Sequence, residues 1–192
     1  MVKLIGAKKV KTAVFISGKG SNLNNLIKFS KKKKSPITID FVVSNKKNAK
    51  GLNFAKKNKI DFKICSFEKN SENKILKILY KKKIKLICLA GFMKILTRKF
   101  INKFNGKIIN IHPSLLPKFK GLNTFKRVLT NNEKKTGCTV HFVNEKLDNG
   151  KIISQKSFFI GAEDDEEKLK NKTQKLEYLV FPESIIKIFQ NN

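Results

Sequence analysis

The first half of the chain alternates short apolar runs with segments in which apolar residues recur every three or four positions. Continuous apolar runs of about four to eight residues are typical of buried strands, and the wider spacing is typical of amphipathic helices. The pattern predicts strands at residues 12–17, 37–43, 62–65, 84–90 and 107–111. It predicts helices at residues 21–29, 49–58, 71–82 and 97–104.

The second half has a different pattern. A helix is predicted at residues 121–129, and two strands at 138–143 and 151–160 flank a turn-rich segment, which indicates a hairpin. Acidic residues at 164–167 favour the start of a final helix, where they interact with the positive end of the helix dipole. We expect this helix to run towards Phe189, with Pro182 as a candidate break.

Strands that alternate with helices predict a parallel sheet with right-handed crossovers. The fold class is therefore α/β, with a Rossmann-like doubly wound, mostly parallel sheet to which a C-terminal β-hairpin and helix are added. A chain of 192 residues, 40% of them hydrophobic, favours one domain over residues 1–192. We expect this domain to have two halves. The first, about 11–105, would be a Rossmann-like, phosphate-binding half, and the second, about 106–192, would carry the catalytic residues.

Charge is the strongest feature of the composition. The formal net charge is +29, which raises the alternative of a lysine-rich nucleic-acid binding protein. Only Arg98 and Arg127 are arginines, so the planar groups that grip phosphates and guanine edges are scarce. Lysines also occur in almost every segment. We therefore predict no specific nucleic-acid partner and expect the charge to attract anionic substrates.

Several features bear on location and metal binding. Lysines interrupt the apolar residues of the N-terminus, and no apolar run approaches the roughly 20 residues of a membrane span. Cys65, Cys88 and Cys138 lie in apolar segments without a CxxC pair, which predicts buried, reduced thiols and no metal. We expect a cytoplasmic protein with no membrane partner.

Ligands of open parallel sheets bind beyond the carboxyl ends of the strands, so the residues there were the first candidates. The segment SGKGSN follows the first predicted strand. Gly20 would let the backbone approach an anion, and Ser21 is predicted to cap the next helix, where N–H groups suit a phosphate. A tight structural turn is the alternative interpretation.

The segment GKIINIHPSLLP contains the fifth predicted strand and the residues that follow it. Because side chains alternate along a strand, Asn110 and His112 are predicted to share one face at the ligand edge, and Pro113 ends the strand. An amide and an imidazole aimed at one point could stabilise an oxyanion and move a proton, as acyl transfer requires. A histidine with only a structural role is the alternative.

The segment GCTVHFVNEKLDNG follows later in the chain. Asp148 is either a turn-former or a carboxylate that raises the pKa of His112. His141 shares a strand face with Thr139, and we interpret it as structural.

SGKGSNL, LAGFMKIL, IINIHPSLLP and GCTVHFVNEKLDNGKII, in this order, closely resemble the glycinamide ribonucleotide formyltransferase family. The resemblance covers nearly all of the chain beyond about residue 10. It implies transfer of the formyl group of 10-formyltetrahydrofolate, the co-substrate, to glycinamide ribonucleotide in purine biosynthesis. NIHPSLLP is shared with methionyl-tRNA formyltransferase and formyltetrahydrofolate hydrolase, so another amine acceptor, or water, is the alternative. The GSN loop is more selective, and we expect the additional domain of those relatives to be absent.

The resemblance also implies roles for individual residues. The catalytic trio would be Asn110, His112 and Asp148. The substrate phosphate would lie against Gly20, Ser21, Asn22, Leu23 and Asn24. Gln174 and Glu177 would bind the same substrate. The folate pocket would be lined by Met93, Lys94, Ile95, Leu96, Asn110, Asn144, Glu145, Lys146, Leu147 and Asp148.

Two basic positions depart from the family pattern. Lys94 stands where arginine is frequent, and Lys69 is the nearest basic residue to a second folate-contacting arginine. Lysine keeps the charge but loses the two-pronged geometry, so looser folate contacts are expected. The small-molecule substrates are the predicted partners, and the protein is expected to be a monomer or a homodimer.

Overall fold

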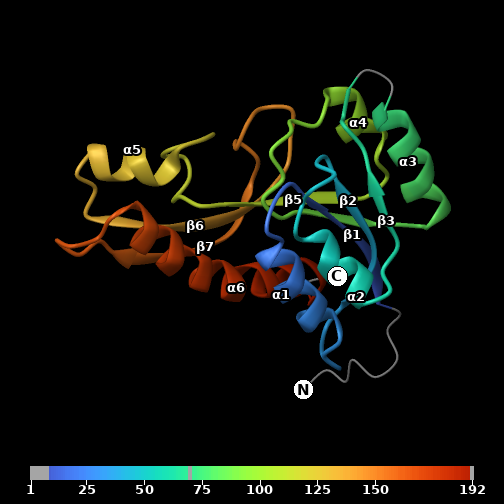
Figure 1. The fold of residues 1–192 in the computed structure, drawn as a ribbon, viewed down its shortest axis with the longest axis horizontal. Coiled ribbons are helices and arrows are strands. Elements are labelled where there is room, and N and C mark those ends of the chain that lie inside the picture. The colour runs from blue at the N-terminus through green and yellow to red at the C-terminus, as the bar shows by residue number, and fades with distance from the viewer. Residues whose placement is uncertain (1–8, 69–70, 191–192) are drawn as a thin grey trace. The chain divides into compact units, whose positions relative to one another are not determined.

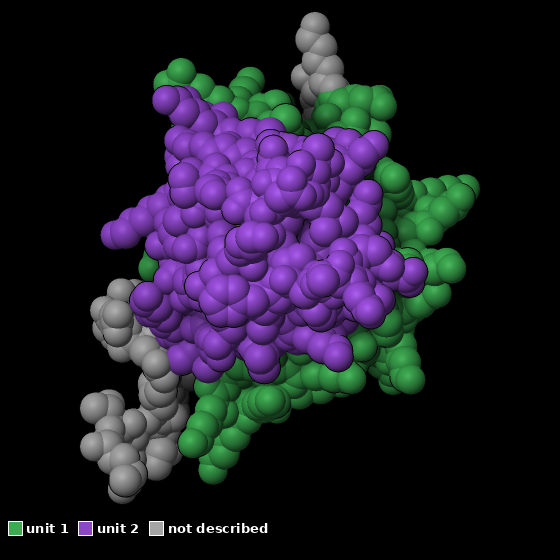
Figure 2. Space-filling view, turned by 90° about the vertical axis from the view of Figure 1, so that its left-hand side faces the viewer, with its two compact units in different colours: residues 1–108 green, residues 109–192 purple. Residues whose placement is uncertain are grey.

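The computed structural model describes residues 9–68 and 71–190. Its strands belong to one seven-stranded sheet in the order β3-β2-β1-β4-β5-β6-β7, and Figure 1 shows the elements as a ribbon. The chain divides into two compact units, residues 1–108 and residues 109–192, which Figure 2 colours green and purple. Each unit is described in turn.

The first unit is a parallel sheet with helical connections. β1 pairs in parallel with β2 and β4, and β2 pairs in parallel with β3. The strands of this unit are β1 (Val10–Ile16), β2 (Ile37–Ser44), β3 (Phe62–Ile64) and β4 (Leu86–Leu89). The helices are α1 (Ser21–Ser30), α2 (Leu52–Lys57), α3 (Ser71–Lys81) and α4 (Arg98–Lys103).

The core of the first unit lies along β1 and β4. Four consecutive residues of β1, Ala13 to Ile16, are fully buried, and all four residues of β4 are buried. A strand covered on both faces needs apolar side chains at every position, which is why these strands are continuous apolar runs in the sequence. Their carboxyl ends carry the loops that begin at Ser17 and Ala90.

The second unit is antiparallel. β5 (Lys107–His112), of which residues 109–112 belong to this unit, pairs with β6 (Lys135–Phe142), and β6 pairs with β7 (Ile152–Phe159). The helices are α5 (Thr124–Thr130) and α6 (Glu166–Gln190). α6 packs against β6 and β7, as Figure 1 shows. The ammonium group of Lys187 on α6 donates to the carbonyl of Ile153 on β7 at 2.9 Å and so links this helix to this strand.

The predicted fold class is confirmed, including the mostly parallel sheet and the C-terminal hairpin and helix. The candidate break at Pro182 is wrong, because α6 continues through that residue. β6 begins at Lys135, three residues before the predicted start, because Lys135 and Thr136 already pair with β7. The single domain stays a prediction.

Two further features bear on the expectations from composition. Cys88 and Cys138 are buried free thiols, but Cys65 is half-buried, so the prediction of buried thiols is wrong for that residue. Burial raises the pKa of Cys138 to about 12. No helix in the described part of the chain is both long and apolar enough to cross a membrane.

Candidate active site

Asn110 and His112 lie on one face at the end of β5, as strand alternation predicts. In the antiparallel ladder with β6, Asn110 pairs with His141 and His112 pairs with Thr139. His112 is 5% exposed, and Asn110 is half-buried. The end of β5 therefore offers an amide and an imidazole beside the side chains of β6.

Asp148 reaches the same place from the loop between β6 and β7. The Phe142 N–H donates to the Lys151 carbonyl at 2.9 Å and closes this loop at its base. Gly150 lies so close to Phe142 that an added Cβ would stand 1.7 Å from its carbonyl oxygen, so only glycine fits there. Asp148 adopts a left-handed φ of 44°, which aspartate tolerates, and is 9% exposed.

The three side chains expected to be catalytic meet at the Asp148 carboxylate. One oxygen, Oδ2, lies 3.3 Å from His112 Nδ1 and accepts the Gly121 N–H at 2.9 Å. The other oxygen, Oδ1, accepts from Asn110 Nδ2 at 3.3 Å. The structure thus brings together Asn110, His112 and Asp148 within residues 109–192.

Protonation of this cluster follows from burial and hydrogen bonds. Burial acts to raise the pKa of Asp148, but its interaction with the His141 side chain, the hydrogen bond from the Gly121 N–H and its interaction with His112 bring it below its ordinary value. Asp148 is therefore ionised at neutral pH.

Burial also lowers the pKa of His112. The Phe119 carbonyl, 2.8 Å from Nε2, and the Asp148 charge act in the opposite direction and do not offset the burial. Asp148 therefore acts on His112 in the predicted direction, but burial has the larger effect, and the pKa of His112 in the unliganded protein lies below its ordinary value. Both ring nitrogens of His112 face acceptor oxygens, so a neutral ring that donates from Nε2 to the Phe119 carbonyl leaves Nδ1 unprotonated beside Asp148.

His141 also belongs to this cluster, which the alternation of side chains along its strand did not predict. Its Nε2 lies 3.2 Å from Asn110 Nδ2 and 3.6 Å from Asp148 Oδ1, and it is 2% exposed. Strand alternation alone did not place it, because the contact depends on which residue of β6 faces Asn110 across the ladder. The antiparallel register was the missing information.

Thr139, by contrast, has a structural role. Its hydroxyl donates to the Ser114 carbonyl at 2.6 Å and accepts from the Leu116 N–H at 3.1 Å. Gln155 donates to the same hydroxyl at 2.8 Å and to the Leu116 carbonyl at 2.9 Å. These bonds fix residues 114–116 of the loop that follows β5.

The segment expected to help line the folate pocket is the tip of the Asp148 loop. Asn144 organises it, accepting from the Lys146 N–H at 3.0 Å and donating to the Asn149 carbonyl at 3.2 Å. Glu145, Lys146 and Leu147 are exposed, and the side chain of Leu147 is 53% accessible. An exposed apolar side chain beside a buried carboxylate suits a ligand with an apolar ring.

The predicted phosphate loop lies at the start of α1. Gly20, and not Ser21, is the N-cap, with a left-handed φ of 75° and no side-chain cap hydrogen bond. An added Cβ on Gly20 would stand 2.4 Å from the Gly51 Cα, so this turn excludes any larger residue. Asn22 is buried, and Leu23 is completely buried, so the side chain of Leu23 belongs to the core.

The loop after β4 carries the remaining candidates of the first unit. Met93 and Ile95 are 60% and 71% exposed, Lys94 is exposed, and Leu96 is buried. The Ser17 hydroxyl accepts the Met93 N–H at 2.7 Å, which ties this loop to the end of β1. Lys69 lies outside the described residues.

Gln174 and Glu177 are half-buried on α6, three residues apart and thus on one helix face. The charge of Glu177 acts on Cys138 of β6 and raises its pKa, after the larger effect of burial. Both residues belong to the same unit as the catalytic trio. The phosphate loop and the loop after β4 belong to the other unit.

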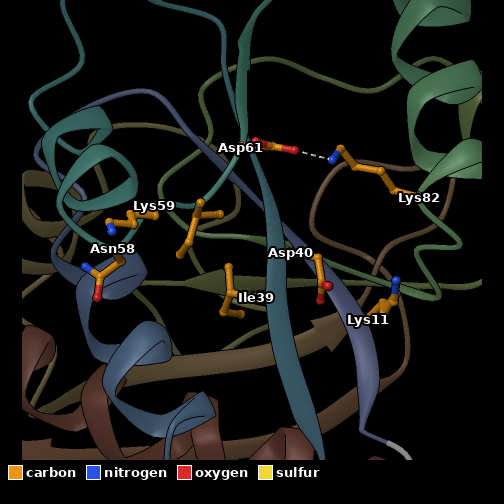
Figure 3. Close-up of a pocket in the computed structure, with 8 residues that line it drawn as sticks. Lys11, Ile39, Asp40, Asn58, Lys59, Asp61 and Lys82 are labelled. Atoms are coloured by element: carbon orange, nitrogen blue, oxygen red, sulfur yellow. Dashed lines mark hydrogen bonds and ion pairs between the residues drawn. The ribbon is translucent and has the colours of Figure 1, made fainter.

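A pocket of about 380 Å³ lies elsewhere in the first unit, at the amino end of the strands. Figure 3 shows Lys11 of β1, Asp40 of β2 and the ion pair between Asp61 and Lys82 around it. It contains none of the predicted site residues. Within residues 9–68 and 71–190, no group of three or more His, Cys, Asp or Glu side chains could hold a metal ion.

Comparison with known proteins adds independent information. The model of the formyl transferase family matches residues 10–185. A phosphoribosylglycinamide formyltransferase of Haemophilus influenzae is 44% identical over 177 residues, which are 90% of this chain and 84% of that protein. The crystal structure of a phosphoribosylglycinamide formyltransferase from Anaplasma phagocytophilum is 38% identical, with a TM-score of 0.91 over 96% of this chain and 88% of that one.

A trifunctional purine biosynthetic protein adenosine-3 of Gallus gallus is 43% identical over 186 residues. The match includes 94% of this chain but only 18% of that longer protein. The chain therefore corresponds to one part of the trifunctional relative and to most of the Haemophilus protein.

Proposed function

This chain belongs to the formyl transferase family, and we propose that it transfers the formyl group of 10-formyltetrahydrofolate to the amine of glycinamide ribonucleotide. The main support for this reaction is that Asn110 and His112 both contact the ionised Asp148. Asn110 Nδ2 and His112 Nδ1 each lie 3.3 Å from one of its carboxylate oxygens. The relatives named for this reaction support the acceptor.

The first step is attack of the amine on the formyl carbon. A new carbon–nitrogen bond forms, and the carbonyl electrons move onto oxygen to give a tetrahedral intermediate with an oxyanion. Asn110 Nδ2 donates to this oxyanion in place of its long contact with Asp148. A donor aimed at the developing charge stabilises the transition state more than the substrate, and so accelerates the step.

The second step is transfer of a proton from the attacking nitrogen to N10 of the folate. Neutral His112 accepts the proton at Nδ1, because Nε2 already holds a proton and donates it to the Phe119 carbonyl, and burial keeps the pKa of the ring low. The resulting imidazolium donates from Nδ1 to Asp148, which is 3.3 Å away, and from Nε2 to the Phe119 carbonyl at 2.8 Å. The Nδ1 proton then passes to N10, which restores the neutral ring. The carbonyl re-forms from the oxyanion, the carbon–N10 bond breaks, and tetrahydrofolate leaves.

The substrate phosphate is proposed to bind at the N-terminal end of α1. The positive end of the helix dipole and the backbone N–H groups there suit an anion. The residues proposed are Gly20, Ser21, Asn22, Leu23 and Asn24, and Leu23 takes part through its backbone because its side chain is buried. Gln174 and Glu177 are proposed to bind the rest of the ribonucleotide through polar side chains.

The residues proposed to contact the folate belong to two loops. One is the loop from Met93 to Leu96, whose Met93 and Ile95 offer apolar surface, and the other is residues 144–148. Lys94, and Lys69 by resemblance alone, would attract the folate carboxylates. The net charge of +29 would draw both anionic substrates towards the protein.

The surroundings of the reaction are also proposals. We expect the protein to act in the cytoplasm, as a monomer or a homodimer, with no nucleic acid or membrane as a specific partner. Size-exclusion chromatography with light scattering distinguishes the two oligomeric states.

The acceptor is tested by supplying one preparation with 10-formyltetrahydrofolate and, in separate reactions, glycinamide ribonucleotide, charged initiator tRNA or no acceptor. We expect rapid release of tetrahydrofolate only with glycinamide ribonucleotide. Equal release without an acceptor would indicate a hydrolase, and release only with the tRNA would indicate a different formyltransferase.

A further inference from the structure

The structure assigns His141 as a positioning residue that fixes the amide of Asn110 with its NH₂ group turned towards the reaction site. This inference rests on the proposed function, because it concerns the same oxyanion donor. It goes beyond the trio by giving a role to a residue that neither touches the reacting atoms nor follows from the resemblance.

Asp148 determines which end of the Asn110 amide faces it. The ionised carboxylate can only accept, so the amide atom 3.3 Å from Oδ1 must be the nitrogen. Rotation of the amide by half a turn would bring two oxygens together. The Asn110 NH₂ group therefore points at Asp148.

The same nitrogen lies 3.2 Å from Nε2 of His141. Since Nδ2 of Asn110 can only donate, Nε2 must accept and carries no proton. A neutral imidazole with an unprotonated Nε2 holds its proton on Nδ1. His141 is thus required to be the Nδ1–H tautomer.

The opposite side of the ring gives the same answer independently. Nδ1 of His141 lies 2.8 Å from the Phe142 carbonyl oxygen, which accepts only, so Nδ1 must carry the proton. The carbonyl therefore selects the tautomer that offers a lone pair to Asn110. Burial of the ring, at 2% exposure, keeps water from competing for either nitrogen.

The two hydrogens of the amide consequently have different roles. The one that faces Asp148 makes a long contact of 3.3 Å and can be given up to an oxyanion. The other hydrogen remains hydrogen-bonded to Nε2 of His141. The Asn110 amide therefore does not rotate when the oxyanion replaces Asp148 as the acceptor of the first hydrogen. His141 acts through Asn110 and should affect the rate of transfer more than the binding of either substrate.

Asparagine and glutamine substitutions provide a matched pair. In His141→Asn, the short amide can replace Nδ1 and keep the contact with Phe142, but it does not reach Asn110. In His141→Gln, the longer amide can place its oxygen where Nε2 was. We expect kcat to fall roughly 3- to 10-fold in His141→Asn, the equivalent of one net hydrogen bond, with recovery in His141→Gln and little change in KM.

A residue that only supported folding would give equal kcat values in both variants at equal thermal stability, which would overturn the inference. The loss caused by His141→Asn should also disappear on an Asn110→Ala background, since His141 acts through that amide. An undiminished loss in the double variant would equally contradict it.

The tautomer can be measured without any catalysis. The chain has two histidines, so ¹⁵N-histidine labelling gives two imidazole spin systems, and the His141→Gln variant identifies which belongs to His141. We expect its Nδ1 to be protonated and its Nε2 unprotonated at neutral pH. A protonated Nε2 would overturn the inference even if formyl transfer is observed. Absence of formyl transfer with the expected tautomer would refute the proposed function alone.

Discussion

Replacing Asp148 with asparagine removes one negative charge from the site while it keeps the shape of the side chain. In the proposed mechanism His112 becomes charged only during the reaction, so the substitution should act on kcat. Two opposite unit charges 3.3 Å apart attract by about 5 kcal/mol at an effective dielectric constant of about 20. Since about 1.4 kcal/mol is a factor of ten, the full loss would be about 4,000-fold.

The asparagine oxygen can still accept a hydrogen bond, which recovers part of this energy. We therefore expect kcat to fall roughly 100- to 3,000-fold, with KM for both substrates changed less than about threefold. Steady-state transfer from 10-formyltetrahydrofolate to glycinamide ribonucleotide, followed by absorbance of the folate product, measures both constants. A fall of less than about tenfold in a folded Asp148→Asn protein would refute the reasoning.

The pH profile gives a second result from the same variant. The ionised Asp148 acts to raise the pKa of His112, so its removal should lower that pKa further. If neutral His112 is the base, kcat/KM falls at low pH, and this acid limb should move to lower pH in Asp148→Asn. Asp164→Asn is the matched control, because that carboxylate is paired with Lys172 at 2.7 Å, away from the trio. Its kinetics should be unchanged.

Three other substitutions have defined outcomes. Asn110→Ala should lower kcat about 100- to 1,000-fold in the same assay, by loss of one oxyanion donor, and an unchanged kcat would exclude that role. Gly20→Ala should destabilise the protein and raise KM for glycinamide ribonucleotide, because its Cβ would meet Gly51, as denaturation and kinetics would measure. Thr97→Ala should lower the free energy of unfolding by about 1 kcal/mol without affecting kcat, since the Thr97 hydroxyl caps α4 by accepting the Phe100 N–H at 3.1 Å.

The parts of the site that lie on a single element could be predicted from the sequence. Alternation along one strand is enough to place Asn110 and His112 on one face, and a proline after them marks the end of the strand. Continuous apolar runs likewise predicted the buried strands of the first unit. These features depend on neighbours in the sequence, which the chain itself displays.

The parts that depend on distant residues could not be predicted in this way. His141 joins the cluster through the β5–β6 register, in which it faces Asn110, and a shift of one residue would have turned it to the other face. The pKa of His112 depends on burial, which lowers it, and on the Phe119 carbonyl and the Asp148 charge, which raise it. The sequence does not show how large the effect of burial is. The left-handed cap at Gly20 results from its close approach to Gly51.

Identification of the formylated product tests the central claim most directly. The protein is incubated with 10-formyltetrahydrofolate carrying a ¹³C-labelled formyl carbon and with glycinamide ribonucleotide, and the products are analysed by mass spectrometry. We predict formylglycinamide ribonucleotide that contains the label, together with an equal amount of tetrahydrofolate. Labelled formate with no formylated ribonucleotide would contradict the account.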